Sequence, residues 1–207
     1  MTKPLVLIGG GGHAVVVCEA ARLSGHDIVG VLDDAPSPHV CQGDDQPGRL
    51  GPLQDQSYLN DRSWILCMGD LDVRREMHDV LLDRMDNAGT VIHPTAFVSP
   101  SAELGRGVYV GPGAVVHSRA YVADHAIVNT GAVIEHDCRV GTGSHIAPNA
   151  TLGGGALVGA YALVGLVSTV LPHITVGSGA VVGAGSVVTK PVDDNAQVIG
   201  SPAKVQA

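Results

Sequence analysis

The chain has 207 residues, and its 20 acidic residues outnumber its 12 Lys and Arg, which gives a formal net charge of −8. This balance argues against a protein that coats nucleic acid or an anionic membrane, and 45% apolar residues argue against a disordered chain. Only 3% of the residues are aromatic, whereas Gly occurs 28 times, so we expect a core of small, repeated layers.

The first ninety residues have a βαβ pattern. The apolar runs that predict strands lie at 5–8, 28–32 and 64–68. Helical spacing follows the first run over Ala14–Leu23 and the third run over about 73–85. A strand, a Gly-rich loop, a helix and a second strand predict a small Rossmann-like domain with a parallel sheet.

Four glycines, Gly9–Gly12, separate the first strand from its helix. With Ala14 they fit the dinucleotide-binding fingerprint, and Asp33 lies where that fingerprint places its ribose-binding acid. Ninety residues provide only one mononucleotide half, and amides at a helix N-terminus favour phosphate. We therefore expect a nucleotide-diphosphate or sugar-nucleotide site in place of an NAD site. A glycine turn that serves only tight strand–helix packing is the alternative.

A six-residue repeat occupies the next part of the chain. From Ile92 to Val188 every sixth residue is aliphatic, which makes seventeen consecutive hexads, and the residue four positions later is Ala, Ser or Cys in fourteen of them. A period of six fits neither a helix nor simple strand alternation. It predicts a parallel β-helix with one hexad per side and 18 residues per coil. An antiparallel barrel with accidental periodicity is the alternative.

This repeat resembles that of the hexapeptide acyltransferases, and the ending VVTKPVDDNAQVIGSPAKV is similar to theirs. The resemblance implies a left-handed coil, a homotrimer with active sites between subunits, and acyl-CoA bound between neighbouring prisms. The expected fold class is an α/β N-terminal Rossmann-like βαβ domain followed by a left-handed parallel β-helix. The expected domains are 1–90, 91–192 and a C-terminal tail, 193–207.

The order of motifs narrows the resemblance. A Gly-Gly-His turn after the first strand, an Asp pair after the second, and the β-helix behind them resemble one subgroup over essentially the whole chain. It comprises sialic acid O-acetyltransferases and nucleotide-amino-sugar N-acetyltransferases, including those of bacillosamine and perosamine. The resemblance implies that the nucleotide sugar is held by Gly11, Gly12, His13, Asp33, Asp34, Gly69 and Asp70, with Arg74 as a further candidate.

Acyl transfer needs a base that takes a proton from the attacking amine or hydroxyl, and histidine suits this task. Among ten histidines, His136 stands between Glu135 and Asp137, and a neighbouring carboxylate can orient its ring. On the residues alone, a solvated corner histidine is the alternative. Cys138 occupies the small position of its hexad, so we expect buried filler and no covalent acyl-enzyme.

The subgroup resemblance assigns roles near this histidine. It implies that His136 is the general base, that Asp137 supports it, and that Glu135 and Asn129 are polar neighbours. It further implies that acetyl-CoA is the co-substrate. The residues that would contact it are His145, Gly154, Gly165, Leu166 and Ala184.

The function that the resemblance implies is N-acetylation of a nucleotide-linked 4-amino-deoxy sugar by direct transfer from acetyl-CoA. O-acetylation of sialic acid or another sugar hydroxyl is the alternative from the same apparatus. A zinc hydratase using His117, His136 and His145, or a non-catalytic solenoid, fits the sequence less well, and no metal is expected.

The compartment is predicted from cysteine spacing and from the start of the chain. The four cysteines form no CxxC pair, the first residues lack a signal-peptide pattern, and no apolar stretch approaches the ~20 residues of a membrane helix. We expect a soluble, cytoplasmic protein without nucleic-acid or membrane partners.

Overall fold

The computed structural model describes residues 3–206, and the chain divides into two compact units whose boundary lies between Pro94 and Thr95. Within the described residues, no helix has both the length and the apolar character needed to cross a membrane.

The first unit is built around a parallel sheet of four strands in the order β3-β2-β1-β4. The sheet strands are β1 (Leu5–Ile8), β2 (Ile28–Leu32), β3 (Arg49–Gly51) and β4 (Ser63–Leu66), and β5 (Val91–Ile92) follows them in the chain. The helices are α1 (Gly12–Leu23) and α2 (Leu71–Val80), with 3-10 turns at η1 (His39–Cys41), η2 (Gln56–Leu59) and η3 (Leu82–Asn87). Every residue of β1 is buried, as in the central strand of a sheet covered on both faces.

Two features of this unit differ from the sequence prediction. Strand β3 lies in a region where the sequence predicted only a loop. The strand was missed because it has only three residues, and it forms by pairing with β2 at the edge of the sheet. Helix α2 begins earlier than predicted because the Asp70 carboxylate accepts hydrogen bonds from the amides of Asp72 and Val73. It ends earlier because the amide of Leu81 is shared between two carbonyls and the chain tightens into η3.

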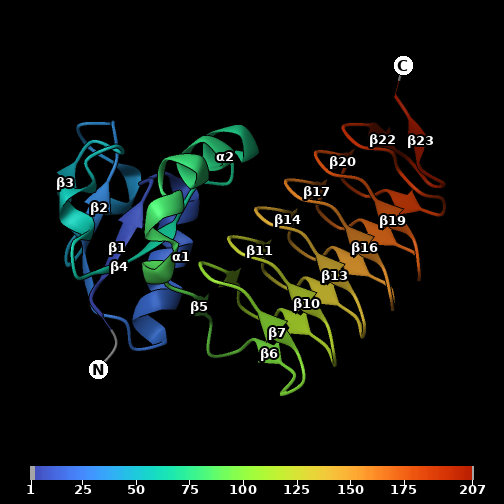
Figure 1. The fold of residues 1–207 in the computed structure, drawn as a ribbon, viewed down its shortest axis with the longest axis horizontal. Coiled ribbons are helices and arrows are strands. Elements are labelled where there is room, and N and C mark those ends of the chain that lie inside the picture. Colours follow the sequence, from blue (N-terminus) through green and yellow to red (C-terminus); the bar gives the residue numbers. More distant parts are fainter. Residues whose placement is uncertain (1–2, 207) are drawn as a thin grey trace. The chain divides into compact units, whose positions relative to one another are not determined.

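The second unit is a three-sided parallel β-helix, drawn from green to red in Figure 1. Each predicted inward aliphatic residue from Val98 to Val188 is the second residue of a two-residue strand. The strands are β6 (Phe97–Val98), β7 (Glu103–Leu104), β8 (Tyr109–Val110), β9 (Val115–Val116), β10 (Tyr121–Val122), β11 (Ile127–Val128), β12 (Val133–Ile134), β13 (Arg139–Val140), β14 (His145–Ile146), β15 (Thr151–Leu152), β16 (Leu157–Val158), β17 (Leu163–Val164), β18 (Thr169–Val170), β19 (Thr175–Val176), β20 (Val181–Val182), β21 (Val187–Val188), β22 (Gln197–Ile199) and β23 (Lys204–Val205).

Every third strand joins the same sheet, so a coil comprises 18 residues. One sheet runs β6-β9-β12-β15-β18-β21, a second runs β7-β10-β13-β16-β19, and the third contains β8-β11-β14-β17-β20-β22-β23. The pairing of Ile134 with Val116 and with Leu152 illustrates the register. The small hexad residues, such as Ala132 and Ala150, are buried and let the corners close. Strands β22 and β23 extend the third sheet into the segment predicted to be a tail.

The corners of the β-helix place one residue per hexad at positive φ. Glycine occupies many of these positions, and Arg119, Asp137 and Val167 occupy others with φ of 57°, 62° and 57°. A side chain at such a position raises the energy of the backbone, so a non-glycine residue there is held for another reason.

Candidate active site

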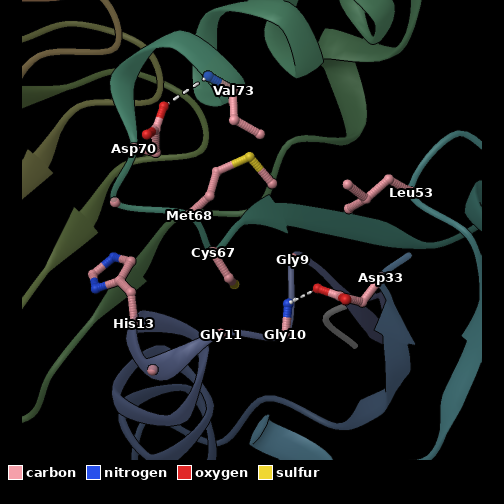
Figure 2. A pocket seen from close by; sticks show the side chains of 12 residues that line it. Gly9, Gly10, Gly11, His13, Asp33, Leu53, Cys67, Met68, Asp70 and Val73 are labelled. Atoms are coloured by element: carbon pink, nitrogen blue, oxygen red, sulfur yellow. Dashed lines mark hydrogen bonds between the residues drawn. The ribbon is translucent and has the colours of Figure 1, made fainter. Parts of the chain in front are cut away.

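A cavity of about 250 Å³ lies in the first unit, where the carboxyl ends of β1, β2 and β4 meet (Figure 2). Strand β1 pairs with β2 on one side and β4 on the other, and ligands of open parallel sheets bind at such a switch in strand order. The cavity is lined by Gly9, Gly10, Gly11, Gly12, His13, Asp33, Leu53, Cys67, Met68, Gly69, Asp70 and Val73.

The four glycines at this cavity divide into two pairs. Gly9 has a φ of 92°, and a Cβ on Gly10 would overlap the side chain of Pro38, so packing accounts for both. A Cβ on Gly11 or Gly12 would meet no atom within 4 Å. The fold therefore does not require glycine at these two positions, and glycine there leaves the backbone amides open to the cavity.

The aspartates after β2 organise the glycine loop. One oxygen of Asp33 accepts the amide of Gly10 at 2.6 Å, as Figure 2 shows, and the other accepts the amide of Ala35 at 2.8 Å. The neighbouring Asp34 accepts the amide of Leu53 at 3.0 Å and is not among the lining residues. Asp33 thus both shapes the loop and faces the cavity.

Two helices begin at the cavity with different electrostatics. Helix α1 has no side-chain cap and no acidic residue in its first turn, so the positive end of its dipole is uncompensated. Helix α2 carries the carboxylate of Asp70 as its cap. An anionic group is therefore favoured at the start of α1, beside Gly11 and His13.

Arg74, the further candidate for this cavity, does not line it. Its side chain is fully buried, and its Nη1 donates to the carbonyls of Leu66 at 3.2 Å and Met68 at 2.8 Å. It joins α2 to the end of β4, so a role in ligand contact was the wrong expectation.

The second cluster lies in the β-helix, at the corner after β12. His136 Nδ1 lies 2.7 Å from Oδ2 of Asp137, and a carboxylate only accepts, so Nδ1 carries the proton and Nε2 presents its lone pair. Arg119, one coil earlier, donates to both oxygens of Asp137 at 2.7 and 2.8 Å. The hydrogen bonds from Arg119, followed by that from His136, hold the pKa of Asp137 well below its usual range.

Gly154 lies directly after this histidine in the coil stack. A Cβ on Gly154 would lie 2.7 Å from both Cε1 and Nε2 of His136, so the absence of a side chain leaves room for the ring. The amide of Gly155 donates to the carbonyl of His136 at 2.9 Å, which ties the two coils together. Glu135 accepts from the amide of His136 at 3.4 Å. About half of the His136 side chain is exposed.

The other predicted polar pair lies at the preceding corner, after β11. The Asn129 carboxamide oxygen accepts the amide of Thr130 at 2.8 Å, so its nitrogen faces Nε2 of His145 at 3.0 Å. Nε2 of His145 is then an acceptor, and its proton resides on Nδ1. Within one chain, this pair and His136 lie at different corners, separated by the side of the prism that contains β12.

The remaining predicted CoA residues lie at the same corner as Asn129, on later coils. A Cβ on Gly165 would lie 2.5 Å from the carbonyl oxygen of Val182 and 2.8 Å from the amide nitrogen of Ala184. Coil stacking therefore accounts for Gly165 without a ligand. Leu166 is 53% exposed, which leaves an apolar side chain on the surface of the chain.

Two observations bear on the zinc-hydratase alternative, which would use His117, His136 and His145. His117 accepts the amide of Ser118 at 2.9 Å and makes an edge-to-face contact with Phe97, at a ring-centroid distance of 6.3 Å. Within residues 3–206, no group of three or more His, Cys, Asp or Glu side chains is arranged to hold a metal ion.

Comparison with known proteins gives the chain a family. The PglD N-terminal domain family matches residues 4–81. The structure of PerB from Caulobacter crescentus, in complex with CoA and GDP-perosamine, is 35% identical, covers 99% of this chain and 97% of its own, and has a TM-score of 0.89. The chain belongs to the nucleotide-amino-sugar acetyltransferases. The left-handed β-helix and the acyltransferase assignment predicted from the sequence are confirmed.

Two other solved structures resemble this acetyltransferase. The acetyltransferase domain of PglB from Neisseria gonorrhoeae FA1090, in complex with acetyl coenzyme A, is 33% identical, covers both chains fully and has a TM-score of 0.90. WeeI from Acinetobacter baumannii AYE is 21% identical over 99% of this chain and 100% of its own, with a TM-score of 0.84, and shares the fold. No curated protein sequence matches the chain.

Sequence reasoning missed Arg119 in this acetyltransferase. The signal was present, because Arg119 precedes Asp137 by 18 residues, which is the length of one coil. A charged residue at a corner of the β-helix is not recognisable as functional by itself. Only the stacking of residues 18 positions apart pairs Arg119 with Asp137.

The β-helix contains one cysteine, Cys138, which lies next to Asp137 in the sequence. Cys138 is fully buried, its Sγ donates to the carbonyl of Gly153 at 3.2 Å, and burial raises the pKa of its thiol. Cys138→Ala, which places at this position the residue found at the same place in other hexads, should retain kcat within about twofold. Steady-state kinetics check this, and accumulation of an acylated cysteine, or a Cys138→Ala enzyme without activity, would point to a covalent route.

Proposed function

We propose that the protein transfers the acetyl group of acetyl-CoA to the amino group of a nucleotide-linked 4-amino-deoxy sugar. Its similarity to PerB, whose structure contains CoA and GDP-perosamine, supports this substrate class. The uncompensated N-terminus of α1 beside Gly11 and Gly12 suits the diphosphate of such a sugar. Asp33 faces the same cavity and retains acceptor capacity for a ribose hydroxyl.

His136 acts as the general base in this proposal. The observation that carries this assignment is its 2.7 Å hydrogen bond to Asp137, which in the neutral ring places the proton on Nδ1 and the lone pair on Nε2. Nε2 of His136 takes a proton from the sugar amine while the nitrogen of that amine attacks the thioester carbonyl. The C–S bond then breaks, and the CoA thiolate takes up the proton that His136 Nε2 received from the amine, which restores the neutral ring. Asp137 stabilises the imidazolium that forms in this step.

We further propose that the enzyme acts as a homotrimer with its active sites between subunits. His136 and Gly154 lie at one corner of the prism, whereas Asn129, His145 and Leu166 lie at another. Two such corners form one site when neighbouring prisms are placed side by side. An exposed leucine at the second corner is consistent with a surface that another subunit or CoA covers.

The cytoplasmic location is part of the same proposal. All four cysteines are free, and disulfides are rare in the reducing environment of the cytoplasm.

The test is CoA release from acetyl-CoA with a panel of acceptors. The panel contains GDP-, UDP- and dTDP-linked 4-amino-6-deoxy sugars, the corresponding 4-hydroxy sugars, and free sialic acid. We expect turnover of at least one amino-sugar nucleotide, with an amide in the product by mass spectrometry. Turnover restricted to sialic acid or to a 4-hydroxy sugar would mean that the enzyme is an O-acetyltransferase.

A further inference from the structure

Arg119 has an unusual combination of backbone and side-chain geometry. Its φ of 57° places it in the left-handed region, where glycine occupies the equivalent corner position of many other hexads. Other non-glycine residues, among them Tyr161 and Val167, occupy equivalent corners, so it is the side-chain contact of Arg119 that sets it apart. Its guanidinium donates from Nε and from Nη2 to the two oxygens of Asp137.

The two-point contact determines how Asp137 meets His136. Oδ2 of Asp137 accepts from both His136 Nδ1, at 2.7 Å, and Arg119 Nη2, at 2.8 Å. A fork-shaped donor fixes the plane of the carboxylate, and the carboxylate in turn fixes the ring of His136. A lone exposed ion pair contributes little to stability, and the Arg119 side chain is 66% exposed. Fold stability is therefore a weak reason for this arrangement.

We infer that Arg119 is a positioning residue for acetyl transfer, which holds Asp137 so that His136 directs Nε2 at the acceptor amine. This inference rests on His136 being the general base. Arg119 has a second effect through charge, because it compensates the negative charge of Asp137. Without it, the carboxylate favours the protonated imidazolium more strongly, and a protonated ring is no base.

The other charged groups at this corner are few. On its own coil, His136 adjoins Glu135 and Asp137, and the preceding coil contributes Arg119 and His117, whose strand register places it over Glu135. The following coil contributes glycines 153–155, which carry no charge. Within the described residues, Arg119 and His136 are the two basic side chains that contact Asp137.

The experiment compares pH–rate profiles of three variants with the parent enzyme. Arg119→Gln removes the charge and the fork, and Arg119→Lys keeps the charge without the fork. Arg106→Gln makes the same charge change at an exposed residue of a different corner. Acetyl-CoA and the best acceptor of the panel are used for all, and thermal midpoints are recorded.

For Arg119→Gln we expect kcat to fall roughly tenfold, with both KM values within about twofold of the parent. The acidic limb of the profile should move to higher pH. Arg119→Lys should restore the limb but recover only part of kcat, and Arg106→Gln should match the parent.

Two results would overturn the inference. One is an Arg119→Gln enzyme with the parent's kcat and acidic limb. The other is a fall in kcat that is equal at every pH and parallels a lower thermal midpoint, which would indicate a structural role. His136→Ala separates this failure from that of the proposed function. If His136→Ala is inactive while Arg119→Gln is unchanged, only the role of Arg119 is wrong, and if His136→Ala is fully active, the base assignment itself fails.

Discussion

His136→Ala should lower kcat by a factor on the order of 10²–10⁴, the contribution of a general base, and leave both KM values within a few-fold of the parent. The ring is held by Asp137 and lies over Gly154, with about half of its side chain exposed. Its removal leaves no packed cavity, so the fold should survive. In the proposed function other groups bind the two substrates, which is why the effect should fall on kcat.

The matched control is His39→Ala. His39 is an exposed histidine in the 3-10 turn η1 of the first unit, and it does not line the cavity. We expect the parent's kcat from this variant. Steady-state kinetics with acetyl-CoA and an amino-sugar nucleotide measure both enzymes. A His136→Ala enzyme with more than a tenth of the parent's kcat would contradict the base assignment.

The pH dependence of the parent enzyme follows from the same contacts. Because the pKa of Asp137 is held well below its usual range, this carboxylate remains ionised throughout the region where carboxylates ordinarily titrate. The pH–rate profile should therefore show no step from protonation of Asp137 in that region, and such a step would contradict this account.

Gly11→Asp should separate folding from binding. Gly11 is the N-cap of α1 with an extended backbone, and a side chain there meets no atom within 4 Å. An aspartate at an N-cap satisfies helix amides and complements the dipole, so the free energy of unfolding should rise by about 0.5 kcal/mol. The same carboxylate would repel a diphosphate, and KM for the nucleotide sugar should rise on the order of 100-fold.

The control for this prediction is Gly11→Asn, which has the same size and caps a helix without a charge. We expect its KM to stay within about tenfold of the parent. Denaturant unfolding and substrate-saturation curves measure the two effects. Equal KM increases in both variants would mean that side-chain size, and not charge, excludes the substrate. An unchanged KM in both variants would mean that the diphosphate does not bind at the start of α1.

The repeat could be predicted from the sequence because its determinant is local. One inward aliphatic residue per hexad and one small residue four positions later define each side of the prism without reference to distant residues. The structure places the predicted aliphatic residue second in every strand from β6 to β21. The boundaries of α2 were less predictable, because its start depends on a cap at Asp70 and its end on a change of hydrogen-bond pattern at Leu81.

The candidate sites divide in the same way. The motif Gly-Gly-His and the acids beside His136 can be read in the sequence, as can a likeness to acetyltransferases. The sequence does not distinguish Gly10, which packing against Pro38 requires, from Gly11, which packing does not require. Both have the same side chain, and only their surroundings differ.

The sequence by itself determined the period of six, the two-part organisation and the residue types of the chemistry, because these depend on short-range patterns. Only the tertiary structure decided which partners those residues have. It placed Arg119 on Asp137, buried Arg74 against β4, and opened the start of α1 to the cavity. The physical reason is that a charged or polar group is defined by its neighbours in space, and stacking of coils and strands brings those neighbours from distant parts of the chain.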